Sequence, residues 1–362
     1  MAGNGAFVTN LQPSVVVVGA GPAGAMAALT LARSGLGVQL IARELHLSPR
    51  IAETLSPEGR SELAVSGLWD RLPAGLLVPC PTVVSAWRQA EPTWQSFITN
   101  PYGCAWHVDR GRFDTWLVAE AEAAGATLVT GTVIGIRRAS CRWELHIRGA
   151  NREDRAAIAS ILVLATGRCG FAASLGGRER IDALCLIGGF SKPMADAGDS
   201  LLVEAVPDGW WYSAPATDGR MFAAWMTDPA LIAGKRWCDI MTTSLRRAPL
   251  TRSRLANPRE VFSVGVVSST LRPCAGDGWI AVGDAMLARD PVSGEGLACA
   301  LRSARYGAKT IMNALKGDAF AWHAASIRGV EVTAQYRKQR AIAYRAAQTR
   351  WPAEQFWARR LN

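Results

Sequence analysis

The order of hydrophobic and polar positions divides the chain into α/β segments and sheet-like segments. Residues 14–43, "SVVVVGAGPAGAMAALTLARSGLGVQLIAR", give an apolar run, a glycine-rich turn, an alanine- and leucine-rich stretch and a second apolar run, which predicts a strand–helix–strand unit. "FDTWLVAEAEAAGATLVTG" (113–131) predicts a helix over 113–124 and then a strand. "ASILVLATG" (159–167) and "GWIAVGDA" (278–285) each predict a short buried strand, and a helix is expected from about Glu295.

Between these segments lie β-like stretches near 82–99 and 183–271. We therefore expect an α/β fold, in which a nucleotide-binding domain is assembled from separate segments, an antiparallel β-sheet substrate domain is inserted into it, and a helical segment follows. The expected nucleotide-binding segments are 1–81, 105–170 and 273–320, the substrate segments are 82–104 and 171–272, and the C-terminal helical segment is 321–362.

One aromatic stretch, "DGWWYSAPATDGRMFAAWMTD" (208–228), predicts the middle of an antiparallel meander, because turn-forming residues bound its two bulky runs. Side chains alternate along a strand, so Trp210 and Tyr212 are expected on one face and Trp211 on the other. Aromatic residues are common in strands for packing reasons alone. The rings are therefore either sheet core or the wall of a pocket.

Composition indicates a globular protein with a reduced, metal-free interior. The chain has 362 residues, 49% of them hydrophobic, which is enough for a full core. Its eight cysteines form no C-x-x-C pair and its four histidines have no metal-ligand spacing, so we expect no metal and a cytoplasmic location. Residues 14–32 carry no charge, but their glycines and proline, and the lack of Lys or Arg in residues 1–13, argue against a membrane span or a secretory signal.

The net charge of +10 rests on thirty-five arginines and only five lysines. Residues 321–362 carry eight basic and two acidic residues, a net charge of +6. This pattern predicts a basic helical segment that is either a solvated helix face or a docking surface for an acidic protein partner. No nucleic-acid or membrane partner is expected.

The turn after the first strand holds a dinucleotide-binding motif, Gly19-Ala-Gly21-Pro-Ala23-Gly24. Its glycines permit a tight turn, so that backbone N–H groups and the helix amino terminus can approach a pyrophosphate. The acidic residue that usually follows the second strand is replaced by Ala42. Glu44 is one substitute, and Arg43 is another candidate for contact with the adenosine part.

A second group of motifs carries a family resemblance. Gly283-Asp284, Asp290-Pro291-x-Ser293-Gly294-x-Gly296 and the following helix resemble the second FAD fingerprint of flavin monooxygenases related to p-hydroxybenzoate hydroxylase and of the flavin halogenases. "ILVLATGR" (161–168), "DRGRFDTWL" (109–117) and "AETLSP" (52–57) resemble other flavin-contacting segments of that family, in the family's order.

The resemblance implies FAD as the cofactor and a Rossmann-like FAD-binding domain of the glutathione reductase type. It implies that Arg110 lies over the pyrophosphate, that Asp284 accepts hydrogen bonds from ribityl hydroxyls and that Pro291 shapes the wall beside the flavin. Backbone amides near Gly294 and Gly296 would approach the flavin N1 and C2 carbonyl edge, where they favour the negative charge of reduced flavin. The remaining implied cofactor-contacting residues are Thr166, Gly167 and Gly283.

The aromatic stretch refines the resemblance. Flavin halogenases carry W-x-W-x-I-P on the substrate side of the flavin, and residues 210–215 fall in the equivalent order. Halogenases also carry a lysine in the N-terminal third, whereas the first lysine here is Lys192, so halogenation is not expected. "DGWWYSAP" and "RWPAEQFWARR" (350–360) resemble the shorter flavoproteins that oxidise tryptophan residues in the maturation of quinone cofactors and of peptide-derived natural products.

This likeness implies hydroxylation of an electron-rich aromatic ring, an indole within a peptide or protein or a small molecule, through a flavin C4a-hydroperoxide. Trp210, Trp211 and Tyr212 are the predicted substrate-binding residues, and His107 and Glu53 are candidate catalytic bases by residue type and by their nearness to flavin segments. NAD(P)H or a partner flavin reductase is the expected reductant. The alternatives are a reductase or dehydrogenase of an apolar small molecule, similar to geranylgeranyl reductases, and a flavin-binding partner protein without activity.

Overall fold

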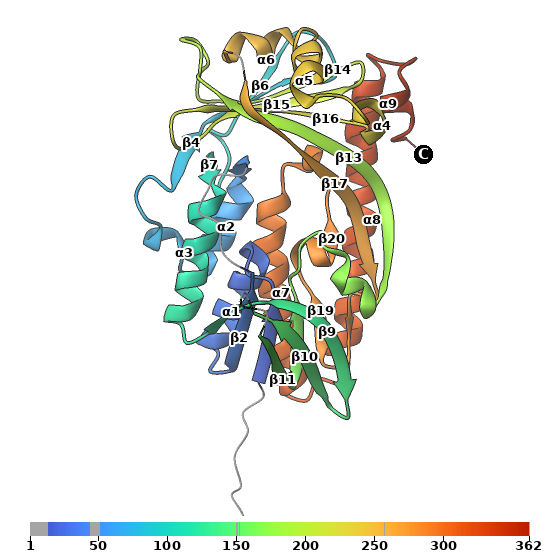
Figure 1. The fold of residues 1–362 in the computed structure, drawn as a ribbon. Helices are drawn as coiled ribbons and strands as arrows, with labels where there is room; N and C mark the ends of the chain where they lie inside the picture. The colour runs from blue at the N-terminus through green and yellow to red at the C-terminus, as the bar shows by residue number, and fades with distance from the viewer. Residues whose placement is uncertain (1–13, 44–50, 150, 152, 257, 362) are drawn as a thin grey trace, which may run out of the picture.

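The computed structural model describes residues 14–43, 51–149, 151, 153–256 and 258–361, and it places a helix-covered sheet below a large, strongly curved sheet in the view of Figure 1. The lower sheet has six strands in the order β18-β19-β12-β1-β2-β8. Neighbours pair in parallel except β18 and β19. The strands are β1 (Ser14–Val18), β2 (Gly37–Ala42), β8 (Thr127–Thr130), β12 (Ile161–Leu164), β18 (Ala275–Gly276) and β19 (Trp279–Ala281).

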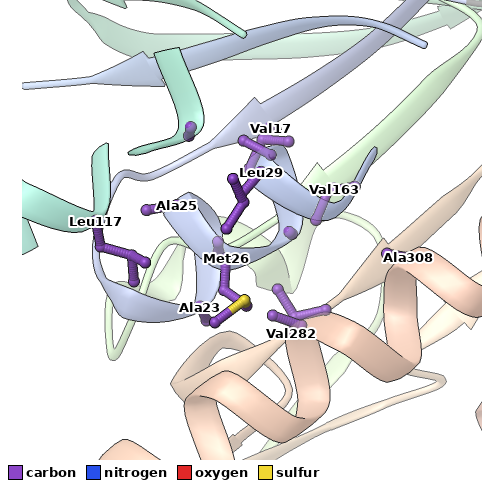
Figure 2. Close-up of a cluster of buried hydrophobic side chains, with 14 of the residues drawn as sticks. Val17, Ala23, Ala25, Met26, Leu29, Leu117, Val163, Val282 and Ala308 are labelled. Carbon is purple, nitrogen blue, oxygen red and sulfur yellow. The ribbon is translucent and has the colours of Figure 1, made fainter. Parts of the chain in front are cut away.

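The parallel sheet is covered on both faces, which explains why β1 is a continuous run of valines. Val15 and Val17 pack with α1 (Pro22–Arg33), α3 (Arg110–Ala123) and α7 (Gly296–Leu315), and Figure 2 shows Met26 and Leu29 of α1 at the centre of this cluster. Val16 and Val18 belong to a second cluster on the opposite face. That face carries a three-stranded antiparallel sheet of β9 (Thr132–Ala139), β10 (Arg142–Arg148) and β11 (Asp154–Ala159).

The large sheet has eight strands in the order β20-β17-β13-β16-β15-β14-β5-β6. They are β5 (Thr82–Ala86), β6 (Thr93–Ser96), β13 (Gly177–Ser191), β14 (Leu201–Val206), β15 (Gly209–Pro215), β16 (Met221–Thr227), β17 (Arg259–Arg272) and β20 (Leu287–Ala288). A small antiparallel sheet of β3 (Ala52–Leu55), β7 (Ala105–Asp109) and β4 (Leu77–Cys80) contacts the large sheet through β3 and β15. β20 follows the glycine-rich 278–285 segment in the chain, yet it pairs with β17 of the large sheet.

The remaining helices lie outside the sheets. α5 (Trp237–Leu245) covers the outer face of the large sheet (Figure 1), where Met241 and Leu245 pack on Trp211 and Trp225. The others are α2 (Pro57–Val65), α4 (Pro229–Ile232), α6 (Pro249–Arg254), α8 (Ala321–Gln348) and α9 (Gln355–Ala358). Short 3₁₀ turns occur at η1 (Trp69–Arg71), η2 (Gly170–Ser174), η3 (Gly283–Ala285) and η4 (Pro291–Ser293). No helix in the described ranges is long and apolar enough to cross a bilayer.

The strand–helix–strand unit, the helix after Glu295 and the helical C-terminal segment are confirmed as β1-α1-β2, α7 and α8. The helix expected over 113–124 starts three residues earlier, at Arg110, because the Asp109 side chain accepts a hydrogen bond from the Arg112 backbone N–H and caps it.

The C-terminal segment does not offer all its charge to a partner. Arg340 and Arg360 are buried and pair with aspartates of the main body: Arg340 with Asp182 and Asp290, and Arg360 with Asp182 and Asp228. These two cations therefore fasten the segment to the fold, and the prediction of an acidic docking partner loses that part of its basis.

Candidate active site

A cavity of about 720 Å³ opens where the carboxyl ends of β1, β2 and β12 meet the amino end of α1. This is the position at which open α/β sheets bind ligands, because strand ends and helix amino termini present free backbone N–H groups there. The walls include the predicted residues Gly19, Gly21, Arg43, Glu53, Arg110, Thr166 and Gly167. Glu44, the proposed substitute for the missing acid, lies outside the described residues.

The glycines at the cavity serve two different purposes. Gly19 has φ +105°, and a Cβ on Gly24 would lie 1.7 Å from the Gly19 carbonyl oxygen, so the fold itself requires these two glycines. A Cβ on Gly21 would have no atom within 4 Å. Glycine at position 21 therefore leaves space that a ligand can fill. The buried Thr166 Oγ1 has no hydrogen-bond partner among the described residues, so a ligand could also satisfy this hydroxyl.

Arg110, the first residue of α3, places a guanidinium in the cavity wall. Its Nη1 lies 2.7 Å from Glu53 Oε1, and its Nε and Nη2 each lie 3.0 Å from an Asp114 carboxylate oxygen. Burial alone would lower the pKa of Arg110, but the Glu53 and Asp114 carboxylates outweigh burial and raise it. Arg110 is thus a fixed cation, and Glu53 serves as its counter-charge.

Arg168 joins three segments at the end of β12. Its Nε lies 3.1 Å from Asp284 Oδ2, and its other nitrogens donate to the carbonyl oxygens of Val267 and Arg289 at 2.8 and 2.7 Å. Burial raises the pKa of Asp284, and the positive charge of Arg168 acts in the opposite direction. Gly283 has φ +60°, and its missing side chain lets η3 approach Ala23 of α1.

The Asp290–Gly296 loop leads from β20 into α7. The Asp290 side chain is fully buried and accepts a hydrogen bond from the Val292 N–H at 3.0 Å, which caps η4. Gly294 follows in the left-handed conformation, with φ +64°. Neither Gly294 nor Gly296 would bring a Cβ within 4 Å of another atom, so the backbone at the start of α7 faces open space.

The three aromatic residues of β15 do not form one wall. Trp211 faces outward, where its Nε1 donates to Ser244 Oγ of α5 at 3.2 Å. Trp210 faces inward but is 1% exposed, packed against Trp87 with a centroid distance of 5.8 Å and clustered with Trp357 of α9. Tyr212 also faces inward and keeps some exposure, in a cluster with Ile51 of the cavity wall.

Tyr212, Thr54 and His107 form a hydrogen-bonded chain whose directions are fixed. His107 Nε2 lies 2.8 Å from the Asp199 carbonyl oxygen, which only accepts, so Nε2 carries the hydrogen. Burial lowers the pKa of His107, and in the neutral imidazole Nδ1 is therefore the acceptor of the Thr54 hydroxyl at 3.3 Å. Thr54 Oγ1 in turn accepts from Tyr212 OH at 3.1 Å. The chain runs from a partly exposed tyrosine to a fully buried histidine.

Residues 12–75 match a family described as FAD binding domain. The chain is 25% identical over 365 residues to the putative FAD-dependent oxidoreductase LodB of Marinomonas mediterranea, covering 95% of this chain and 96% of that protein. Its fold resembles the flavin-dependent halogenase CmlS with a TM-score of 0.88 and 23% identity, covering 96% of this chain and 67% of CmlS. It also resembles the peptidyl tryptophan dihydroxylase QhpG with a TM-score of 0.80 and 26% identity, covering 96% of this chain and 78% of QhpG.

Its fold is that of FAD-dependent monooxygenases and halogenases. This FAD-dependent oxidoreductase has the features that the cofactor demands: free space beside Gly21, a fixed cation at Arg110 and an unsatisfied buried hydroxyl at Thr166. An anionic dinucleotide fits that combination.

The remaining predicted cofactor residues of the flavoenzyme lie around this cavity or along one further path. Ala23 and Gly24 stand behind the cavity in the first turn of α1. Gly283, Asp284, Pro291, Gly294 and Gly296 follow one another from η3 to the start of α7.

Sequence reasoning missed the residues whose partners lie far away in the chain. Thr54 was visible only as part of a flavin-loop resemblance, since nothing local shows that it stands opposite His107 in the β3–β7 pair. The Asp199 carbonyl that fixes the histidine tautomer has no sequence signal at all. Arg168 was visible only as the last residue of the "ILVLATGR" resemblance, and nothing local shows that it pairs with Asp284 or contacts Val267.

Proposed function

We propose that the flavoenzyme hydroxylates an electron-rich aromatic ring, and that the ring is the indole of a tryptophan residue in a peptide or protein. The observation that carries this proposal is the likeness over 96% of the chain to a peptidyl tryptophan dihydroxylase, at 26% identity. The hydrogen-bonded chain from Tyr212 through Thr54 to His107 is consistent with it.

FAD is proposed to lie with its pyrophosphate over the Gly19–Gly24 turn and beside Arg110. Backbone N–H groups at the amino terminus of α1 and the Arg110 guanidinium would then neutralise the phosphates. Thr166 would supply its free hydroxyl, and the Asp284 carboxylate would accept from the ribityl chain. The open backbone at Gly294 and Gly296 would receive the flavin ring beside Pro291.

When bound and reduced, FAD supplies the activation of molecular oxygen. The protein must hold the aromatic ring, exclude water and accept the proton that leaves the ring when a hydroxyl group replaces it. Tyr212 is the proposed contact with the substrate. Its hydroxyl proton can pass to Thr54 as the Thr54 proton passes to His107 Nδ1, so that Tyr212 can take up the substrate proton without becoming an anion. The imidazolium keeps its Nε2–H on the Asp199 carbonyl, and its proton later returns along the same path to leave with water.

This assignment favours His107 over Glu53 as the base. Glu53 Oε1 lies 2.7 Å from Arg110 Nη1, and this ion pair commits Glu53 to a counter-charge role. Neutral His107 has an acceptor nitrogen directed at the chain that begins at Tyr212.

Halogenation is the second candidate, because the fold is also that of a flavin-dependent halogenase. As described above, flavin halogenases carry a lysine in the N-terminal third. Here the first lysine is Lys192, which is exposed after the end of β13. The segments around the cavity therefore lack that group.

The test is a turnover experiment with FAD-loaded protein, NADH or NADPH, chloride and bromide, and a peptide that contains one tryptophan, under ¹⁸O₂. We expect the peptide to gain oxygen from ¹⁸O₂ at its tryptophan, with or without an added flavin reductase as reductant partner. A matched peptide with phenylalanine in place of tryptophan is the control. Gain of halogen instead of oxygen, or turnover confined to free tryptophan or to an isoprenoid alkene, would refute the proposal.

A further inference from the structure

The carboxylate of Asp290 is held by side chains of α8. Tyr344 OH donates to Asp290 Oδ2 at 2.7 Å, and Arg340 Nε donates to the same oxygen at 3.2 Å. The Asp290 backbone N–H donates to Tyr336 OH at 2.8 Å. Three residues of α8, spaced four apart on one face, thus bind one residue of the Asp290–Gly296 loop.

The same helix is fixed to the body at a second level. Arg340 also pairs with Asp182 of β13, which Arg360 Nε approaches to 2.9 Å. Arg360 pairs further with Asp228 at the end of β16. Buried ion pairs of this kind add specificity of position, because losing one partner leaves an uncompensated charge in the interior.

We propose that Arg340 and Tyr344 are positioning residues for FAD, which act by fixing the Asp290–Gly294 turn and with it the free backbone at the start of α7. The inference rests on FAD as the cofactor and is independent of which substrate is oxidised. Tyr344 and Asp290 are both fully buried, so the contact is part of the interior and no solvent replaces it when it is lost.

The Asp290–Gly294 turn is held in place by hydrogen bonds to the Asp290 side chain. Asp290 has two carboxylate oxygens: Oδ1 caps the turn through the Val292 N–H, and Oδ2 accepts from α8. Removing the α8 donors leaves a buried carboxylate whose remaining hydrogen bond in the described structure is the one from the Val292 N–H of its own turn. The turn would then change conformation, and the amides that follow it would move relative to the flavin.

The test compares two variants that each remove one buried hydroxyl from α8. Tyr344→Phe removes the donor to Asp290. Thr333→Val removes the 3.0 Å contact between Thr333 and Thr270 of β17, on the same buried side of α8 but away from the loop. Both proteins are purified without FAD and then titrated with it, while apo-protein melting, flavin absorbance and the midpoint potential of bound FAD are recorded.

We expect both variants to lower the apo-protein melting temperature by a similar small amount. Only Tyr344→Phe should raise the FAD dissociation constant, by about tenfold, and only it should shift the absorbance and the potential of the bound flavin. Tyr336→Phe, which removes the acceptor of the Asp290 N–H, should act in the same direction and serves as the test if Tyr344→Phe does not fold. The inference is overturned if FAD affinity, spectrum and potential match the wild type, or if Thr333→Val changes them equally.

Discussion

The substitution Gly21→Ala tests whether the open space beside this residue is needed by the fold or by FAD. Gly21 has φ −71° and no atom within 4 Å of a Cβ position, so the added methyl group meets nothing in the protein itself. It caps α1, where alanine is less favourable than glycine by about 0.5–1 kcal/mol. We expect the unfolding free energy of the apo-protein to fall by about that much.

Gly24→Ala is the matched comparison. Its Cβ would lie 1.7 Å from the Gly19 carbonyl oxygen, and real Cβ contacts are essentially never shorter than 3.0 Å. The α1–β1 turn must therefore deform, at a cost of roughly 1–3 kcal/mol, only part of which the better helix propensity of alanine offsets. Gly24→Ala should lower the melting temperature clearly, whereas Gly21→Ala should change it by a few degrees at most.

The two variants are assayed by apo-protein melting and by FAD titration. If the pyrophosphate lies over Gly21, the methyl group displaces it from at least one backbone amide, which is worth about 1.5–3 kcal/mol for a charged acceptor. The FAD dissociation constant of Gly21→Ala should then rise about 10- to 100-fold. Wild-type FAD affinity in this variant would show that the phosphates bind elsewhere.

Three further predictions concern the substrate side. Thr54→Val should lower kcat about 10- to 100-fold and change the solvent isotope effect, whereas Thr54→Ser should retain most of the activity. Equal kcat values in Thr54→Val and the wild type would exclude the proton chain. Burial lowers the pKa of His107, so below about pH 6.5 the unfolded chain binds a proton that the folded protein does not bind, and the unfolding free energy falls as the pH is lowered. Denaturant titrations at several pH values should show a flatter pH dependence of the unfolding free energy in His107→Gln. The same pH dependence in the variant and the wild type would contradict this. Trp211→Phe should lower the unfolding free energy with little effect on KM, whereas Tyr212→Phe should change KM with little effect on stability. A change of KM in Trp211→Phe alone would place the substrate on the outer face of the sheet.

Local patterns predicted the parts of the fold whose causes are local. The strand–turn–helix unit follows from valines, glycines and a helical alanine-rich stretch that are adjacent in the chain. Alternation along β15 also predicted that Trp210 and Tyr212 share a face opposite Trp211. The sequence could not tell which elements cover each face, because α5 and α9, which bury Trp211 and Trp210, come from distant segments.

The C-terminal segment shows what a count of charges leaves out. Its net charge of +6 predicted either a solvated helix face or a surface for an acidic partner, and the position of each cation decides more than the sum. Tyr336, Arg340 and Tyr344 are spaced four apart, so a single helix face carries two aromatic rings with an arginine between them. An arginine on an apolar face must be paired inside the fold, and its planar, permanently charged group suits such a pair better than lysine does. The preference of this chain for arginine over lysine thus agrees with a segment whose buried cations hold it against Asp182, Asp228 and Asp290.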